Sequence, residues 1–168
     1  CEAHGATYDG QHVGSFGDIG TFSFFFSHHI STIEGGMVVT DSINRSERIR
    51  MARAHGWVRE LDDINEFREE NPDIDPKFLF AAHGYNLRPT ELQGAFGMHQ
   101  LPKLDDFVDI RRENANQLTN LLEPVSEYFD LFEESDRARA SWFAYPLLVN
   151  HRAPFTRDAL QAYLENHY

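Results

Sequence analysis

The spacing of apolar and polar positions changes along the chain, and the changes predict alternating strands and helices. An aromatic run from Thr21 to Phe26 predicts a buried strand, and the short apolar run from Gly36 to Thr40 predicts a second one. Apolar residues interleaved with Arg and Glu then predict an amphipathic helix from Ile43 to Ala54, ended by Gly56. The first third of the chain therefore mixes strands and a helix, without an internal repeat.

Helices are predicted again in the middle of the chain, where prolines mark their limits. Pro89 suits the first position of a helix that runs to about Leu101, because the first helical residue has no need of its N–H. Pro102 interrupts this helix, and a longer one follows from Leu104 to Leu122. Pro124 then ends the helical part of the sequence.

The pattern after the long helix is strand, strand, helix. Tyr128 to Phe132 and Trp142 to Val149 predict strands, and Thr156 predicts the N-cap of a last helix. A change of this kind is typical of a domain boundary. We therefore predict one domain over residues 1–123 and the beginning of a smaller domain over residues 124–168.

The ends of the chain and its longest aromatic run indicate which classes of protein to expect. The sequence opens on Cys1 and its last predicted helix still runs at Tyr168, so we expect a piece of a longer protein. The longest aromatic run, Phe24 to Phe26, is far shorter than a membrane-spanning segment. We predict a cytoplasmic protein with no membrane partner.

The charge of the chain argues against nucleic acid as a partner. The formal net charge is −12, and acidic residues gather from Asp62 to Asp75 and from Glu133 to Asp136. Phosphate backbones are instead bound by clustered Lys and Arg. The acidic stretch from Asp62 to Lys77 also holds two prolines, and it predicts an exposed excursion.

One short segment carries the residues with the most chemistry. Ser23 and His28 are five residues apart, so a strand that ends between them can bring a hydroxyl and an imidazole into one pocket. The same segment also suits a plain strand end and hairpin, since Gly35 and Gly36 favour a turn. His29 follows His28 and would point to the opposite face of a strand, without a partner at helical spacing, so we predict no metal site.

A resemblance to a known family is carried by the segments CEAHGATYDGQHVGSFGDIGTFSFFFSHHISTIEGGMVVTD and HGYNLRPTELQGAFGMHQLPKLD. Together they are similar to the cofactor-binding core of the DegT/DnrJ-type sugar aminotransferases, pyridoxal-phosphate (PLP) enzymes of fold type I. The likeness covers residues 1 to about 112. It implies an α/β PLP-dependent transferase fold, with residues 1–123 as the C-terminal part of the large domain and 124–168 as the start of the small α+β domain.

The resemblance also implies three cofactor-binding residues. Ser23 matches the family serine that hydrogen-bonds the cofactor phosphate, and Glu2 matches a position, usually Gln, that contacts the phenolic oxygen. Asn86 resembles the asparagine that reaches the phosphate of the neighbouring subunit's cofactor, which implies a homodimer with a shared active site. Asn86 also suits a turn after Gly84, and the two roles are compatible.

His28 stands where most of the family has the lysine that binds the cofactor covalently. Histidine replaces this lysine in the family's NDP-4-keto-6-deoxy-sugar 3-dehydratases, which implies noncovalent pyridoxal or pyridoxamine phosphate (PMP) and His28 as the general base. The implied reaction removes the 3-hydroxyl of a nucleotide-linked 4-keto-6-deoxy sugar, with glutamate as amino donor. The alternatives are an ordinary sugar aminotransferase, which needs a lysine at position 28, and a noncatalytic sugar-nucleotide-binding homologue.

The cysteine content separates two dehydratase types. The CDP-sugar enzymes that this family includes use four cysteines to hold an iron–sulfur cluster, and this sequence has only Cys1. We therefore predict no iron–sulfur cluster and a resemblance to the GDP-4-keto-6-deoxy-mannose type. Cys1 is then predicted to be a small buried residue.

Three further features leave alternatives open. Trp142 and Phe143 suit either the core or the wall of the sugar pocket. Arg88 suits either a substrate phosphate or an ion pair at a helix start. The block from His55 to Trp57 resembles the dehydratases more than the aminotransferases, and the sequence assigns it no role.

Overall fold

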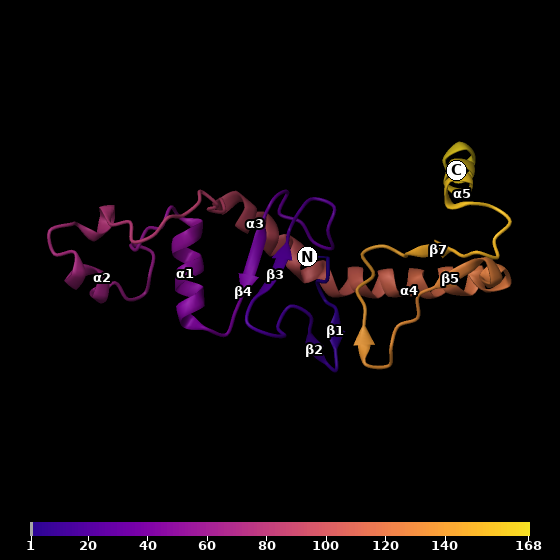
Figure 1. Cartoon of the computed structure of the whole chain (residues 1–168), viewed down its shortest axis with the longest axis horizontal. Helices are drawn as coiled ribbons and strands as arrows, with labels where there is room; N and C mark the ends of the chain where they lie inside the picture. Colours follow the sequence, from indigo (N-terminus) through magenta and orange to yellow (C-terminus); the bar gives the residue numbers. More distant parts are fainter. Residues whose placement is uncertain (1) are drawn as a thin grey trace.

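The structure is a computed structural model that describes residues 2–168. The chain is elongated, with strands β3 (Gly20–Ser23) and β4 (Gly36–Val39) in the middle (Figure 1). Helices α1 (Ile43–Arg53) and α2 (Asn65–Glu70) extend to one side of these strands, and α4 (Leu104–Leu122) extends to the other. The strand pair therefore separates two arms of the molecule.

Short antiparallel pairs make up the sheet structure. β3 and β4 pair from Gly20 opposite Val39 to Ser23 opposite Gly36. A second sheet has the order β2-β1-β6, and β5 pairs with β7. These five strands are β1 Thr7–Tyr8, β2 Gln11–His12, β5 Phe129–Leu131, β6 Ala138–Arg139 and β7 Leu147–Val149. The β1–β6 pair brings the beginning of the chain against its last quarter.

The first predicted strand is shorter than the aromatic run that predicted it. β3 ends at Ser23, although the Phe24 N–H still donates to the Gly35 carbonyl oxygen at 2.9 Å. The chain then turns, because the carbonyl oxygen of Phe25 accepts from the His28 N–H at 3.0 Å. The second predicted strand, β4, is confirmed to within one residue.

Helix α1 confirms the predicted helix, and a position three residues beyond its end requires glycine. The Ser42 hydroxyl accepts from the Arg45 N–H at 3.4 Å as the N-cap. Beyond the helix, Gly56 has φ +85°, and a Cβ at this position would lie 1.7 Å from the carbonyl oxygen of Ala82. A side chain at position 56 would therefore force these two crossing segments apart.

The acidic excursion is more ordered than predicted. It contains α2 and the short 3-10 helix η1 (Pro76–Phe78). A small hydrophobic cluster lies under it, in which Val58, Leu61 and Leu79 are buried. The partly buried side chains packed against this cluster are Met51, Ile64 and Phe67. Burial of Ile64 and Phe67 gives the predicted loop a reason to fold back as a helix.

Helix α3 (Glu91–Gln100) begins two residues later than predicted. Thr90 is its N-cap, since the Thr90 hydroxyl accepts from the Gln93 N–H at 3.4 Å and Gln93 Oε1 accepts from the Thr90 N–H at 2.8 Å. Pro89 thus precedes the cap and is not the first helical residue. The 3-10 helix η2 (Leu101–Lys103) follows, and α4 then has the predicted bounds.

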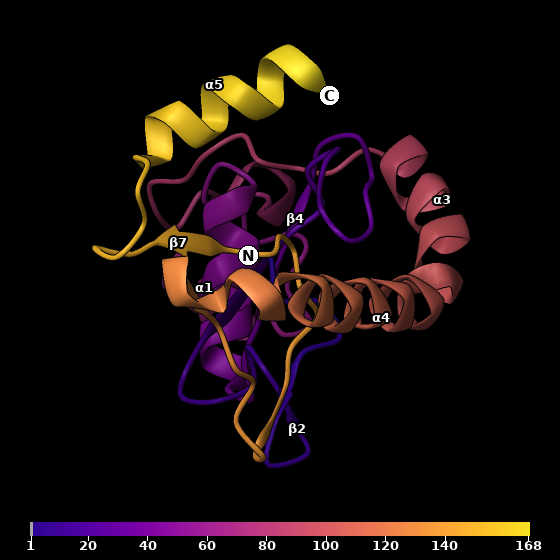
Figure 2. The same cartoon turned by 90° about the vertical axis from the view of Figure 1, so that its right-hand side faces the viewer.

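The part of the chain after α4 only partly follows the prediction. The 3-10 helix η3 (Glu123–Tyr128) leads into β5, and the predicted strand from Trp142 to Val149 forms only at its end, as β7. Helix α5 (Arg157–His167) is capped as predicted, since the Thr156 hydroxyl accepts from the Ala159 N–H at 3.2 Å. Figure 2 shows β7 between α4 and α5. The domain boundary at residues 123 and 124 stays a prediction.

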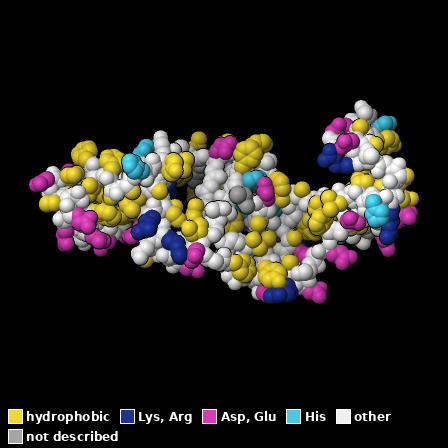
Figure 3. Space-filling view, viewed as in Figure 1, with side chains coloured by type: hydrophobic (Ala, Val, Ile, Leu, Met, Phe, Trp, Pro, Cys, Tyr) yellow, Lys and Arg dark blue, Asp and Glu magenta, His cyan; other side chains and the backbone are white. Residues whose placement is uncertain are grey.

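Much of the apolar surface of the described residues is open. Val58 and Val108 are fully buried, whereas several side chains between residues 78 and 101 are more than 60% exposed. These are Phe78, Tyr85, Leu87, Leu92, Met98 and Leu101. Figure 3 shows apolar side chains over much of the visible face. No helix of residues 2–168 is both long enough and apolar enough to cross a membrane.

Candidate active site

The connection between β3 and β4 carries the predicted site residues Ser23 and His28. Ser23 is the last residue of β3, and the chain turns back so that His28 Nδ1 lies 3.3 Å from the Ser23 carbonyl oxygen. The Ser23 hydroxyl accepts a hydrogen bond from the Phe25 N–H at 3.3 Å. The structure therefore brings these two residues together, with the serine carbonyl rather than its hydroxyl facing the imidazole.

The hydrogen bond to Ser23 selects the tautomer of His28. A carbonyl oxygen can only accept, so Nδ1 carries the proton. The other ring nitrogen, Nε2, lies 3.5 Å from Oε1 of Glu2. The His28 side chain is 10% exposed and that of Glu2 is 49% exposed. His28 is thus a mostly buried imidazole whose Nε2 faces the half-exposed Glu2 carboxylate. A carboxylate at this distance stabilises a proton that Nε2 accepts.

Aromatic rings bound the His28 imidazole on further sides. The ring of Phe143 lies edge-on at a centroid distance of 5.5 Å and an interplanar angle of 90°, and that of Phe25 lies at 5.6 Å and 67°. Phe143 therefore lines the candidate site. Trp142 instead stacks on Tyr145, with centroids 5.6 Å apart. The two aromatic neighbours left open by the sequence thus lie in different surroundings.

His29 makes its contacts away from those of His28. Its Nε2 lies 3.0 Å from the carbonyl oxygen of Ser141, and both residues are 3% exposed. Burial lowers the pKa of His29, and the hydrogen bond to Ser141 opposes this effect in part. His29 is therefore a neutral ring that donates a buried hydrogen bond. Sequence reasoning missed this pair because its members are 112 residues apart.

A second buried histidine, His4, packs against β3. Its ring centroid lies 5.0 Å from that of Phe22 and 5.3 Å from that of Phe24. Burial lowers the pKa of His4 to about 4, and repulsion from the protonated forms of His29 and His28 adds to this effect. Neither ring nitrogen has a hydrogen-bond partner among the described residues. His4 therefore fills space as a neutral ring beside the site, and the sequence carried no signal for this role.

Asn86 lies in a different region of the chain. Its backbone pairs with that of Ala54, just beyond α1, and the residue is exposed. Over residues 2–168, no hydrogen bond or ion pair joins Asn86 to Ser23, Glu2 or His28. The structure therefore brings together three of the four predicted site residues and places the fourth elsewhere.

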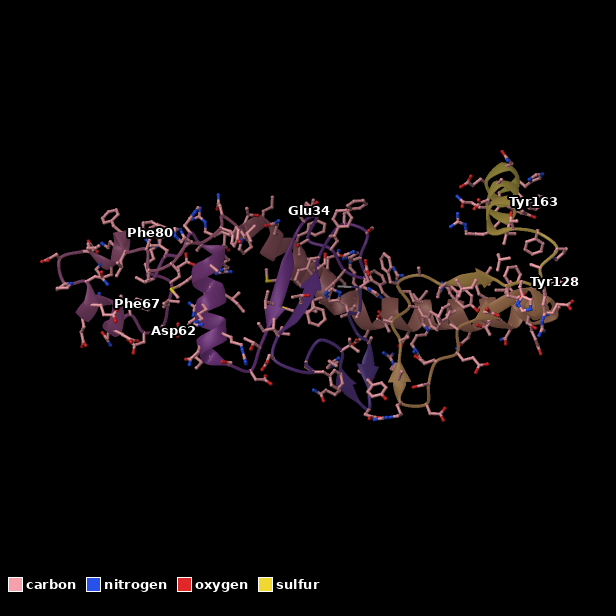
Figure 4. The ribbon with its side chains drawn as sticks, viewed as in Figure 1. Glu34, Asp62, Phe67, Phe80, Tyr128 and Tyr163 are labelled. Atoms are coloured by element: carbon pink, nitrogen blue, oxygen red, sulfur yellow. The ribbon has the colours of Figure 1, made fainter. Side chains whose placement is uncertain are left out.

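An open hollow of about 910 Å³ is lined by residues that precede and follow Asn86 in the chain. The residues that line it are His55, Trp57, Phe80, Ala81, Ala82, His83, Gly84 and Arg88. Phe80 stacks on Trp57 with centroids 5.3 Å apart, and the guanidinium of Arg59 lies 3.5 Å from the centre of the Trp57 ring. Figure 4 labels Phe80 on the α2 side of α1. The block from His55 to Trp57 therefore shapes this hollow, together with Arg88.

The partners available to a molecule bound at His28 are limited. The two lysines lie in other elements, Lys77 in η1 and Lys103 in η2. Residues 2–168 hold no cluster of three or more His, Cys, Asp or Glu side chains suited to a metal ion. Cys1 lies outside the described residues. Among the described residues, a molecule bound beside His28 would therefore meet a hydroxyl, an imidazole and a carboxylate, and no lysine lies in the β3–β4 connection.

Comparison with known proteins identifies relatives along the whole chain. The sequence model of the DegT/DnrJ/EryC1/StrS aminotransferase family matches residues 1–168. The GDP-4-keto-6-deoxy-D-mannose 3-dehydratase of Yersinia pseudotuberculosis is 41% identical over 163 residues, which are 95% of this chain and 40% of that protein. The chain thus spans about two fifths of the length of this relative.

Solved structures agree with the sequence comparison. The E. coli GDP-4-keto-6-deoxy-D-mannose-3-dehydratase with bound hydrated PLP superposes with a TM-score of 0.84 and 35% identity, over 99% of this chain and 42% of that one. A GDP-4-keto-6-deoxymannose-3-dehydratase with a trapped PLP–glutamate geminal diamine gives 0.81 and 34%, over 96% and 42%. The predicted fold is confirmed, since the chain forms part of the PLP-dependent transferase fold. The chain belongs to the DegT/DnrJ/EryC1/StrS aminotransferase family.

Proposed function

We propose that the chain supplies the proton-transfer centre of a PLP-dependent sugar 3-dehydratase. The substrate class is a nucleotide-linked 4-keto-6-deoxy sugar, and the similarity to GDP-4-keto-6-deoxy-D-mannose 3-dehydratases favours a GDP-linked one. The observation that carries this proposal is His28, a mostly buried imidazole with Nδ1 at the Ser23 carbonyl oxygen and Nε2 facing the Glu2 carboxylate. A sugar aminotransferase is disfavoured, because it needs an amine at position 28.

The residues around His28 fit pyridoxal or pyridoxamine 5′-phosphate held without a covalent bond. The Ser23 hydroxyl offers a donor to the phosphate at the end of β3. Glu2 lies 3.5 Å from His28 and offers a carboxyl group to the polar edge of the cofactor ring. When bound, the cofactor supplies an amino group and an electron sink for chemistry at the sugar. No iron–sulfur cluster is part of the proposal.

In this mechanism His28 moves one proton in two steps. Nε2 first accepts a proton from carbon, which frees electrons to expel the 3-hydroxyl of the sugar, and it then returns the proton so that the hydroxyl leaves as water. The Glu2 carboxylate, 3.5 Å away, stabilises the imidazolium between the two steps. The Ser23 carbonyl keeps the proton on Nδ1 throughout. Phe143 and Phe25 limit the access of water to the ring.

We propose glutamate as the amino donor that restores the pyridoxamine form after each turnover. The same nitrogen of His28 serves this step, since moving a proton between the donor's α-carbon and the cofactor again needs one base beside the reacting carbons. Support comes from the similar 3-dehydratase solved with a PLP–glutamate geminal diamine. A cytoplasmic location stays a prediction.

We propose further that Asn86 binds the cofactor phosphate of a second copy of the protein. Asn86 is exposed and lies apart from His28 in its own chain. Its neighbours Tyr85 and Leu87 are 69% and 67% exposed, as expected of side chains that another surface covers. A homodimer of this kind would assemble each active site from two chains.

The test uses the full-length protein incubated with PLP. After borohydride treatment, mass spectrometry should find no phosphopyridoxyl group on any lysine, since His28 cannot form a reducible link. Incubation with glutamate should yield pyridoxamine phosphate and 2-oxoglutarate. A lysine adduct in the cofactor pocket would overturn the dehydratase proposal in favour of an aminotransferase. Loss of both cofactor binding and amino transfer would instead favour a noncatalytic homologue.

A further inference from the structure

The segment before β7 is held by side chains where the sequence predicted a strand. The Ala140 carbonyl oxygen accepts from Arg112 Nη1 at 2.8 Å. Arg111 Nη1 donates to the carbonyl oxygens of Trp142 and Phe143 at 3.1 and 2.9 Å. Trp142 has φ +46°, a left-handed conformation that bulky residues rarely adopt. The arginine contacts therefore hold this segment in an unfavourable backbone conformation.

His29 anchors the same segment from the loop that carries His28. Arg111 and Arg112 reach the segment from α4, whereas His29 donates to the Ser141 carbonyl oxygen from the β3–β4 connection. His29 and Ser141 are almost fully buried, so neither polar group has water as a substitute partner. Leaving a buried carbonyl unpaired would be costly. The pair therefore fixes the position of Ser141 relative to the His28 loop.

Phe143 links the position of Ser141 to the candidate base, because its ring contacts His28. It lies two residues after Ser141, and its ring is 5.5 Å from that of His28 and 6.0 Å from that of His29. Its edge-on contact limits rotation of the His28 ring, because the hydrogen bond to Ser23 alone leaves the ring free to tilt. Displacement of Phe143 would therefore let the His28 ring rotate, so that Nε2 no longer points at the carbon whose proton it accepts in the proposed reaction.

We propose that His29 is a positioning residue, whose hydrogen bond to the Ser141 carbonyl holds Phe143 against His28 and so fixes the direction of the His28 Nε2 lone pair. The inference rests on the proposed function, because it takes His28 as the base. His29 itself exchanges no proton with the substrate, since its ring is buried and its donor is committed to Ser141. Two adjacent histidines thus have separate tasks, one chemical and one geometric.

The activity test uses the full-length enzyme loaded with cofactor. His29→Phe removes the donor but keeps a ring, and we expect kcat to fall by about 10- to 100-fold with KM for the sugar nucleotide nearly unchanged. His29→Gln keeps an amide donor and should recover part of this loss. Phe143→Leu should lower kcat similarly, and the double variant should lose little more than either single variant. The matched control is His151→Phe, at an exposed histidine near β7, which should keep full activity.

A second readout is independent of turnover. In cofactor-free protein with labelled histidines, the ring proton signal of His28 is assigned with His28→Asn. This signal should shift in the same direction in both variants, because the Phe143 ring is displaced from His28 in His29→Phe and is removed in Phe143→Leu. An unshifted signal with unchanged kcat, or additive losses in the double variant, overturns the inference. If His29→Phe fails to fold, His29→Gln and Phe143→Leu decide it by the same signal. An inactive parent enzyme with the expected shift supports the positioning role and counts against the proposed function.

Discussion

The His28 region and the Asn86 region of the same chain are built in opposite ways. Around His28, the β3–β4 connection, the N-terminal residues and the segment before β7 converge, and a buried hydrogen bond joins residues 112 apart. Around Asn86, the chain is exposed and borders an open hollow of about 910 Å³. The surroundings of His28 are therefore enclosed within the chain, whereas those of Asn86 are open. The homodimer proposed above would cover the open region.

The largest expected effect separates the two regions by function. His28→Asn should lower the rate of hydroxyl loss by about 10²- to 10⁴-fold, because the base is removed, while cofactor binding is kept. Asn86→Ala should instead weaken the binding of cofactor phosphate. Single-turnover kinetics with the sugar nucleotide and spectroscopic titration with PLP distinguish the two outcomes. Survival of dehydration in His28→Asn would place the base elsewhere.

Mixing His28→Asn with Asn86→Ala, at a cofactor concentration too low to occupy the Asn86→Ala site, tests whether the two regions meet across a dimer. If each site takes His28 from one chain and Asn86 from the other, random mixing leaves about a quarter of all sites intact. Activity should therefore reappear when His28→Asn and Asn86→Ala proteins are unfolded and refolded together. The control is a mixture of His28→Asn with the double variant, which should stay inactive. Failure of the first mixture would contradict the shared site.

A smaller effect measures how much the contacts of Glu134 stabilise the segment before β7. Glu134 accepts two hydrogen bonds from Arg112, each of 2.7 Å, and a third from the Ala140 N–H, and the Arg112 and Glu134 side chains are 26% and 23% exposed. Glu134→Gln should lower the free energy of unfolding by about 1–3 kcal/mol. Asp158→Asn, in an ion pair with exposed Arg157, should change it by less than about 0.5 kcal/mol. Urea unfolding of both variants provides the comparison.

The free energy of unfolding should also depend on pH, because His4 and His29 are buried near His28. The pKa of His4 is about 4 in the folded chain and near 6.5 in the unfolded chain. Burial also lowers the pKa of His29 in the folded chain. The unfolded chain therefore binds more protons below pH 6.5, and stability should fall by roughly 1 kcal/mol per pH unit from pH 6.5 toward 4. His4→Phe, which keeps a ring against Phe22, should reduce this slope. Urea midpoints at pH 7, 6 and 5 test it, and an unchanged slope would contradict the assignment.

The smallest effect concerns a hydrogen bond that joins α3 to the β3–β4 connection. Gln93 Nε2 donates to the Glu34 carbonyl oxygen at 2.7 Å, and its Oε1 accepts from the Thr90 N–H in the cap of α3. Figure 4 shows Glu34 at the turn beyond β3, close to α3. Gln93→Glu keeps the cap but loses the donor, so stability should fall by about 0.5–1.5 kcal/mol. Thr90→Val, which loses the cap and keeps this hydrogen bond, is the matched control in thermal unfolding.

Local sequence signals predicted the long helix well and the strands poorly. Helix α4 has the predicted bounds because Pro102 and Pro124 restrict it and its apolar residues keep helical spacing. The strands β1, β2 and β6 were missed, since two-residue strands leave no alternation to detect. The aromatic run after Ser23 resembled a strand, although its last residues turn back. An apolar run reports burial and does not report direction.

The site was predictable where its residues are close in sequence. The five-residue spacing placed Ser23 and His28 together, and the family resemblance added Glu2, which lies 3.5 Å from His28. The contact of His29 with Ser141 was not predictable, because no local pattern links residues separated by 112 positions. The cofactor-binding roles of Ser23 and Glu2 stay predictions, as does that of Asn86.

The double contact of Arg111 has a consequence for genetics. One guanidinium nitrogen holds two successive carbonyl groups, and with them the left-handed turn at Trp142 that aims the Phe143 ring. A random mutation at Arg111 would release this turn without touching the cofactor or the base. Under the proposed function, such a mutant would lose activity as a variant of His28 would, although its altered side chain belongs to α4.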